Sequence, residues 1–184
     1  GRRVPTLVYG GYTWQSIFGA TYFTCGVTTS SEARCWGRNN DGQLGDGTRS
    51  NLSRPTERVS GGHTWQSLSA GESFSCGVTS SVALLYEGYC WGQNFSGQLG
   101  IGSRSERNGV ILTPTLVIGS HSWAMITAGP SHACGVTKSG EAYCWGDNTS
   151  GKLGDGSTEI RPSPTLVSGG HTWQSLSAGT EHTC

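Results

Sequence analysis

The chain repeats itself at intervals of about 50 residues, and this feature constrains its fold more than any other. Pro-Thr-Leu-Val occurs at residues 5–8, 114–117 and 164–167, and Pro55-Thr56 marks the same place in another unit. The four prolines are separated by 50, 59 and 50 residues. The predicted repeats are therefore 5–54, 55–113, 114–163 and a shorter unit, 164–184. Because one such unit cannot bury a hydrophobic face alone, the 184 residues belong to one stacked array.

Two signatures hold their places within the units. A tryptophan precedes a cysteine by eleven residues in each, at Trp14 and Cys25, Trp65 and Cys76, Trp123 and Cys134, and Trp173 and Cys184. A second signature, Cys-Trp-Gly, begins at Cys35, Cys90 and Cys144. It is followed by Asn-x-x-Gly-(Gln/Lys)-Leu-Gly at 39–45, 94–100 and 148–154. Three units are complete and one is short.

Each unit consists of short strand patterns separated by glycine-rich turns. Residues 173–179 alternate as one predicted strand, 132–137 form a second and 141–145 a third. Between the last two lies Lys138-Ser139-Gly140, a three-residue hairpin loop with glycine at the left-handed position. No stretch carries a helical apolar period. The predicted fold is all-β, built from antiparallel propeller blades.

The cysteines can be placed by hairpin register. If Thr137 lies opposite Glu141, then Cys134 lies opposite Cys144, and Cys25 and Cys35 share that spacing. Cys76 and Cys90 are four residues further apart, an even insertion that keeps both side chains on one face. Opposite Cβ atoms lie roughly 4.5–5.5 Å apart, close to disulfide range.

Disulfides 25–35, 76–90 and 134–144 are thus the favoured interpretation, with Cys184 unpaired within this chain. Buried free thiols in a reducing compartment are the alternative, and zinc is disfavoured because no Cys-x₂-Cys spacing occurs. Disulfides indicate an oxidising compartment, so we expect an extracellular or cell-surface protein.

Three Asn-x-Ser/Thr sequons begin at Asn51, Asn94 and Asn148. The last two occupy one place in their repeats, in a loop that we expect to be exposed. They are candidate N-glycosylation sites, which would fit a secreted protein. The alternative is that asparagine and serine are simply common turn residues.

The combination of Trp-Gly-x-Asn-x-x-Gly-Gln-Leu-Gly with a period near 50 resembles the regulator of chromosome condensation repeat. The resemblance covers essentially the whole chain and implies a seven-bladed β-propeller. Seven blades need roughly 350 residues, so we expect an incomplete propeller of three blades and part of a fourth. The paired cysteines look most like those of secreted members.

That family includes an exchange factor for a small GTPase, a plant ultraviolet photoreceptor and secreted β-lactamase inhibitors, so the resemblance does not fix the activity. The histidine two residues before the first cysteine occurs only as His132 and His182, and Phe23 and Phe74 replace it elsewhere. A packing role that an aromatic ring can share is therefore expected for it, not a catalytic or metal role.

No pattern in the sequence indicates catalysis or a cofactor. Asp41, Asp46, Asp147 and Asp155 lie in glycine-rich loops, but the second repeat lacks the matching acids, so turn chemistry is favoured over calcium. No Gly-Lys-Ser/Thr phosphate loop is present, and nothing pairs a nucleophile with a base. Twelve basic and twelve acidic residues give zero net charge, which argues against nucleic acid binding. The longest apolar run, 82–86, is too short to insert into a membrane.

These observations predict an extracellular, disulfide-stapled propeller that serves as a protein-binding or structural module without catalysis. Its partner, a protein or a glycan, is unknown. Contact is expected at the irregular segments 82–88 and 101–112, through Leu85, Tyr86, Arg104, Glu106 and Arg107. One alternative is a subunit of an extracellular self-assembling structure. Another is a binder of a small GTPase that resembles the exchange factor.

Overall fold

The computed structural model describes residues 7–80, 85–106 and 109–184. Every regular element in these ranges is a β-strand. The strands are β1 (Trp14–Gly19), β2 (Phe23–Thr28), β3 (Ala33–Gly37), β4 (Trp65–Ala70), β5 (Phe74–Thr79), β6 (Gly88–Gln93), β7 (Val110–Leu116), β8 (Trp123–Ala128), β9 (His132–Thr137), β10 (Ala142–Gly146) and β11 (Arg161–Leu166). Over those same ranges, no helix is long and apolar enough to cross a membrane.

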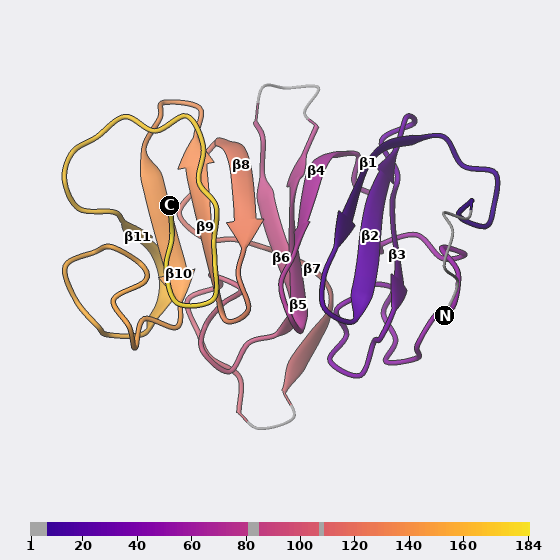
Figure 1. Ribbon diagram of the computed structural model, residues 1–184, viewed down its shortest axis with the longest axis horizontal. Coiled ribbons are helices and arrows are strands. Elements are labelled where there is room, and N and C mark those ends of the chain that lie inside the picture. The colour runs from indigo at the N-terminus through magenta and orange to yellow at the C-terminus, as the bar shows by residue number, and fades with distance from the viewer. Residues whose placement is uncertain (1–6, 81–84, 107–108) are drawn as a thin grey trace.

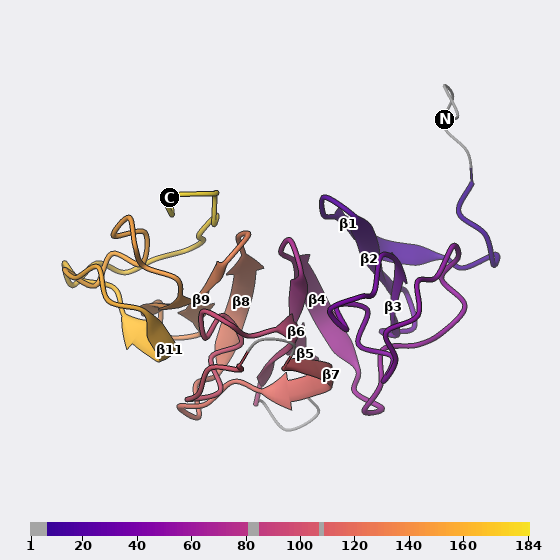
Figure 2. The ribbon, with the colours of Figure 1, turned by 90° about the horizontal axis from the view of Figure 1, so that it is seen from below.

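The strands form three antiparallel sheets, which are the blades of an incomplete propeller. The first blade has the order β1-β2-β3, the second β4-β5-β6-β7 and the third β8-β9-β10-β11. The blades stand side by side in an arc, as the two views in Figure 1 and Figure 2 show. The leading strand β4 contacts both β1 and β8, and the ends of these three strands surround a common cavity, so they lie innermost. The predicted all-β propeller fold is confirmed.

The boundaries between the blades do not coincide with the boundaries between the sequence repeats. Residues Pro114 and Pro164 lie inside β7 and β11, which are the outermost strands of the second and third blades. Each Pro-Thr-Leu motif thus completes the preceding blade, and the next blade begins at the following tryptophan. In the first blade, single bridges of Leu52 with Gly37 and of Arg58 with Arg34 stand in the place of an outer strand.

Two of the three predicted strands agree closely with the structure. Residues 132–137 form β9, and 142–146 form β10, one residue later than expected. Gly140 in the loop between them has φ +86°, the left-handed conformation predicted for it. The predicted strand 173–179 is wrong, because this segment pairs with residues 182–184 only from Ser177 onward, through an isolated Ala178–Thr183 bridge and the backbone hydrogen bonds beside it.

A pair of tryptophans organises the inside of each blade. The rings of Trp65 and Trp91 lie 5.5 Å apart between centroids, and those of Trp123 and Trp145 lie at the same distance. The intervening strand must leave room for the inner ring. A Cβ at Gly77 would lie 2.7 Å from the Trp65 ring, which explains the glycine after each first cysteine.

Candidate functional site: stapled blades and their junctions

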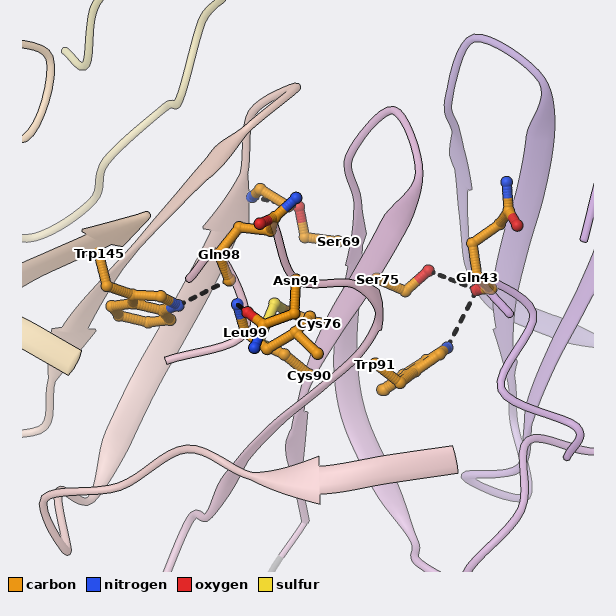
Figure 3. Close-up of a disulfide and its surroundings, with 11 residues drawn as sticks. Gln43, Ser69, Ser75, Cys76, Cys90, Trp91, Asn94, Gln98, Leu99 and Trp145 are labelled. Carbon is orange, nitrogen blue, oxygen red and sulfur yellow. Dashed lines mark hydrogen bonds between the residues drawn. A yellow bond between two sulfur atoms is a disulfide. The ribbon is translucent and has the colours of Figure 1, made fainter. Parts of the chain in front are cut away.

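Each blade is stapled by a disulfide between its second and third strands. Bonds join Cys25 to Cys35, Cys76 to Cys90, and Cys134 to Cys144, with Cα–Cα distances of 4.1, 4.1 and 4.0 Å. The partners lie directly opposite each other in the strand register, as the hairpin spacing predicts. All six cysteines are at most 2% exposed, and the second staple is drawn in Figure 3. Cys184 is free and exposed.

The turn after each Cys-Trp-Gly is held by its first asparagine. The Oδ1 atoms of Asn39, Asn94 and Asn148 accept the backbone N–H of the leucine five residues later at 3.0, 3.1 and 3.0 Å. Their Nδ2 groups donate to the chain that returns past the turn, at Thr48, Ser103 and Ser157 respectively. The asparagine side chain therefore holds the turn together by hydrogen bonds to the backbone on both sides of it.

The loop of the third repeat is exposed at Thr149 and Ser150, as expected, but the asparagines of the last two sequons are not. Asn94 and Asn148 are completely buried, and a glycan on Nδ2 would break the hydrogen bonds that hold the turn in the folded protein. Asn51 lies on the surface, and its Oδ1 accepts the Asn39 backbone N–H at 2.7 Å. Asn51 is thus the exposed one of the three sequon asparagines.

The loop carboxylates bond to their own turns. Asp46 accepts hydrogen bonds from Asn39 and Thr48. Asp155 accepts from Asn148, Ser157 and Arg161. Burial alone would raise the Asp155 pKa, but the Arg161 and Ser157 hydrogen bonds outweigh it and lower that pKa to about 2. These contacts are the turn chemistry that the sequence favoured.

No group of three His, Cys, Asp or Glu side chains within residues 7–80, 85–106 and 109–184 is arranged to hold a metal ion.

A blade junction is formed where the turn of one blade receives the tryptophan of the next. Trp91 Nε1 donates to the Gln43 carbonyl oxygen at 3.0 Å, and Trp145 Nε1 donates to that of Gln98 at 2.9 Å (Figure 3). The final glycine of each turn lies beneath the incoming indole. A Cβ on Gly45 would lie 2.5 Å from Trp91 Nε1. The tryptophan of one Cys-Trp-Gly signature therefore binds the Asn-x-x-Gly-Gln-Leu-Gly turn of the preceding blade.

The spacing of the tryptophans did not identify the carbonyl oxygens of Gln43 and Gln98 as acceptors for the indole N–H groups. The available signal was that Gly-(Gln/Lys)-Leu-Gly follows every Cys-Trp-Gly, although the tryptophan and the turn that touch belong to successive repeats.

The innermost strands are joined by side chains that reach the neighbouring backbone. Gln15 Nε2 donates to the Gln66 carbonyl at 3.4 Å, and Gln66 Nε2 donates to that of Ala124 at 3.2 Å. At the other end of these strands, Ser69 Oγ accepts the Ala128 N–H at 2.9 Å. β4 and β8 are thus tied at both ends, and β1 is tied to β4 at one end.

A cavity of about 280 Å³ lies where the inner strands end, lined by small residues at 19–21, 70–72, 128–130 and 178–180. A Cβ at Gly71 would lie 2.6 Å from the Gly129 carbonyl oxygen, and one at Gly129 would lie 2.7 Å from that of Gly179. Close approach of the backbones around the axis therefore requires glycine here. Glu72 supplies the carboxylate among the described lining residues.

His132 occupies the place that Phe23 and Phe74 fill in the other blades. It is completely buried, and its Nε2 lies 3.0 Å from Thr183 Oγ1. Burial, aided by the charge of Lys152, lowers the His132 pKa to about 4, so the ring is neutral at physiological pH. A buried neutral ring fits the expected packing role.

The expected contact residues do not form one surface. Leu85 and Tyr86 precede β6, whereas Arg104 and Glu106 follow it, so the two groups lie at opposite ends of the second blade. In Figure 1 these segments lie at the top and the bottom of the arc. Leu85 is 56% exposed, and the Tyr86 ring lies beneath Lys138 Nζ at 3.8 Å. Arg107 and residues 82–84 lie outside the described residues.

Disulfide-linked antiparallel blades of three or four strands, arranged about a common axis, define a β-propeller. Family profiles described as the regulator of chromosome condensation (RCC1) repeat match residues 35–84 and 88–136, and also 18–43 and 126–152. These matches extend over more than half of the chain. The chain therefore belongs to the RCC1 repeat family.

Individual relatives agree with this assignment. The chain is similar to the ultraviolet-B receptor UVR8 of Arabidopsis thaliana, with 36% identity over 130 residues that make up 67% of this chain and 27% of that protein. It is similar to the probable E3 ubiquitin-protein ligase HERC4 of Homo sapiens, with 31% identity over 147 residues, or 77% of this chain and 13% of that protein.

Among solved structures, Prp20p of Saccharomyces cerevisiae superposes with a TM-score of 0.79 at 19% identity, over 92% of this chain and 42% of that one. This likeness shows the fold. The chain spans about a quarter or less of the length of the two curated relatives.

Proposed function

We propose that the chain is the stapled part of an extracellular β-propeller that binds another protein and carries out no catalysis. The single observation that carries this proposal is the buried disulfide repeated at the same position of three blades. Disulfides persist in oxidising compartments and are rare in the cytosol, where thiols are kept reduced. A staple in every blade suits a protein that keeps its shape without intracellular chaperones.

The exposed apolar residues support one end of the blades as the contact surface. Leu85 lies in the β5–β6 connection, and Leu116 and Leu166 are the last residues of β7 and β11. Because antiparallel strands alternate in direction, these three positions share the hairpin end of their blades. They are 56%, 47% and 53% exposed, and Ile118 beside them is 41% exposed. Exposed apolar side chains that recur at one end of a propeller suit a protein partner.

The location is tested by counting thiols in the protein taken directly from its source. Alkylation before reduction, followed by mass spectrometry, should modify Cys184 and leave the other six cysteines protected. Modification of all seven would overturn both the staples and the extracellular assignment.

The contact surface is tested by chemical cross-linking of the tagged protein in its native extracellular medium. Leu116→Glu should reduce cross-linked partner several-fold, whereas Arg104→Glu, at the opposite end of the blade, should not. If Arg104→Glu alone abolishes cross-linking, the partner binds the other end.

Two other proposals are distinguished by separate measurements. A self-assembling subunit should form larger species as its concentration rises in analytical ultracentrifugation, whereas a module for a different partner stays monomeric. Prp20p has been described with its binding to Gsp1p and histones, and that description belongs to Prp20p. An exchange factor-like function of this chain would require faster nucleotide release from a small GTPase, which our proposal predicts to be absent.

A further inference from the structure

The fifth residue of each Asn-x-x-Gly-(Gln/Lys)-Leu-Gly turn has a long polar side chain. In the first two turns this side chain folds back on its own turn. Gln43 Oε1 accepts the Asp41 backbone N–H at 3.0 Å. Gln98 Oε1 accepts the Ser96 backbone N–H at 2.9 Å. The two amides are therefore held in the same orientation, and Figure 3 shows the Gln43 amide pointing away from Trp91.

In the second and third blades, the residue directly after Cys-Trp-Gly supplies an acceptor to this side chain. Gln98 Nε2 donates to Gln93 Oε1 at 3.3 Å. Lys152 Nζ donates to Asp147 Oδ2 at 2.8 Å. The side chains at these two positions, five residues apart, thus face each other, and in the third blade the acceptor carries a full negative charge.

The first blade has a donor where the other two have an acceptor. Arg38 follows Cys-Trp-Gly there, and a guanidinium group has only N–H donors. Arg38 Nε and Gln43 Nε2 are both buried, and neither has a hydrogen-bond partner among the described residues. Turning the amide over does not resolve the conflict, because Nε2 would then face the Asp41 N–H, another donor. Two buried donors therefore need an acceptor that the chain itself does not provide.

The surroundings of these donors favour a small negative ion. The Asp41 carboxylate lies 3.6 Å from Arg38 Nη2, so this ion pair engages the end of the guanidinium and not its Nε. The Arg38 side chain is 41% exposed, which leaves a route from solvent along the guanidinium. Gln43 is completely buried, so only a small group can reach its Nε2.

We propose that the first blade junction binds a monatomic anion such as chloride between Arg38 Nε and Gln43 Nε2. Such an ion accepts several N–H groups at once, and its hydrogen bond to a guanidinium is strengthened by the opposite charges. It takes the place that the Asp147 carboxylate fills in the third blade. A water molecule can accept the same two bonds but brings no charge, and the test separates the two. This inference does not depend on the proposed extracellular function.

The test compares the melting temperature of the whole 184-residue chain in sodium chloride and in sodium gluconate. The two salts are matched in ionic strength, so they screen exposed charges equally. Gluconate is too bulky to reach a buried amide. Chloride should raise the melting temperature along a saturating curve, by roughly 3–6 °C when its concentration is about tenfold above Kd.

Variants that supply the acceptor from within the chain should remove this chloride shift. Arg38→Gln copies the amide pair of the second blade. Gln43→Glu keeps one oxygen for the Asp41 N–H and turns a second oxygen toward Arg38. Gln98→Glu is the matched control, because it introduces the same charge at the second junction, and it should keep the shift.

The ion is located by X-ray diffraction from crystals of the unaltered chain grown in sodium bromide. We expect an anomalous bromide peak within hydrogen-bond distance of both Arg38 Nε and Gln43 Nε2. Equal melting temperatures in the two salts at every concentration would mean that only water satisfies these donors. A chloride shift that persists in both Arg38→Gln and Gln43→Glu, or bromide peaks only elsewhere, would likewise overturn the proposal.

Discussion

The indole nitrogen of Trp91, in the second blade, donates a hydrogen bond to the carbonyl oxygen of Gln43, in the turn of the first blade. Ser75 Oγ donates to the same oxygen at 2.8 Å, so one buried carbonyl receives both donors (Figure 3). Because Gln43 precedes Trp91 by 48 residues, this contact joins successive repeats. The junction is therefore a defined polar contact inside an apolar interface.

Trp91→Phe should lower the free energy of unfolding by about 1–2 kcal/mol, because it removes the indole donor and some buried surface while Ser75 still satisfies the carbonyl. Denaturant unfolding followed by circular dichroism measures the change. Trp36→Phe, at a half-buried ring of the first blade, is the matched control and should cost less. A larger effect of Trp36→Phe would contradict the importance of the junction.

Gly45→Ala should destabilise the chain by about 2 kcal/mol more than Gly47→Ala. Both glycines have positive φ, +70° and +84°, so alanine adds similar backbone strain of about 1 kcal/mol at each. Only at Gly45 does the new Cβ overlap the Trp91 ring, whereas at Gly47 the nearest atom is 3.9 Å away. Equal melting temperatures for the two variants would refute this account of the turn.

Replacing Cys76 and Cys90 together by alanine should cost about 3 kcal/mol, since their disulfide closes a loop with a sequence separation of 14. Thermal unfolding compared with and without reductant checks this value. The unaltered chain should lose stability when reduced, and the double variant should lose less because one staple is already gone. A reductant effect that is the same in both proteins would contradict the prediction.

His132→Phe should make the protein less sensitive to acid. The His132 pKa of about 4 lies below the ordinary value of 6.5, so between these pH values the unfolded chain binds a proton that the folded chain does not. Stability is therefore lost as the pH falls through that range, by on the order of 2 kcal/mol.

Phenylalanine removes the titrating ring, and Phe74 shows that the same place accommodates it. The measurement is the melting temperature at pH 7 and pH 4.5. An unchanged acid response in His132→Phe would mean that other groups dominate it.

The staples were predictable because hairpin loops convert sequence spacing into strand register. Once Lys138–Gly140 is recognised as a three-residue loop, the position of Cys144 opposite Cys134 follows from counting. Counting also places Cys76 opposite Cys90 in the second blade, where the loop is longer. The number of extra residues is even, so both cysteines stay on one face of the sheet.

The burial of Asn94 and Asn148 was not predictable from the sequon pattern. A sequon covers three adjacent residues, whereas the hydrogen bond that buries each asparagine reaches a residue five positions later. The leucine N–H five residues later decides where the asparagine side chain points. The separation of Leu85 from Arg104 could have been deduced, since β6 lies between them and must carry the chain from one end of the blade to the other.

The tie from Gln15 to Gln66, and from Gln66 to Ala124, connects each blade only to its neighbours. Cooperativity in such a series behaves as a one-dimensional chain of coupled units, in which damage at one unit is transmitted through its adjacent interfaces. Within this 184-residue chain the second blade contacts a complete blade on each side and should be the last to melt. Native-state hydrogen exchange would then be slowest in β5 and β6 and would quicken toward the first and third blades.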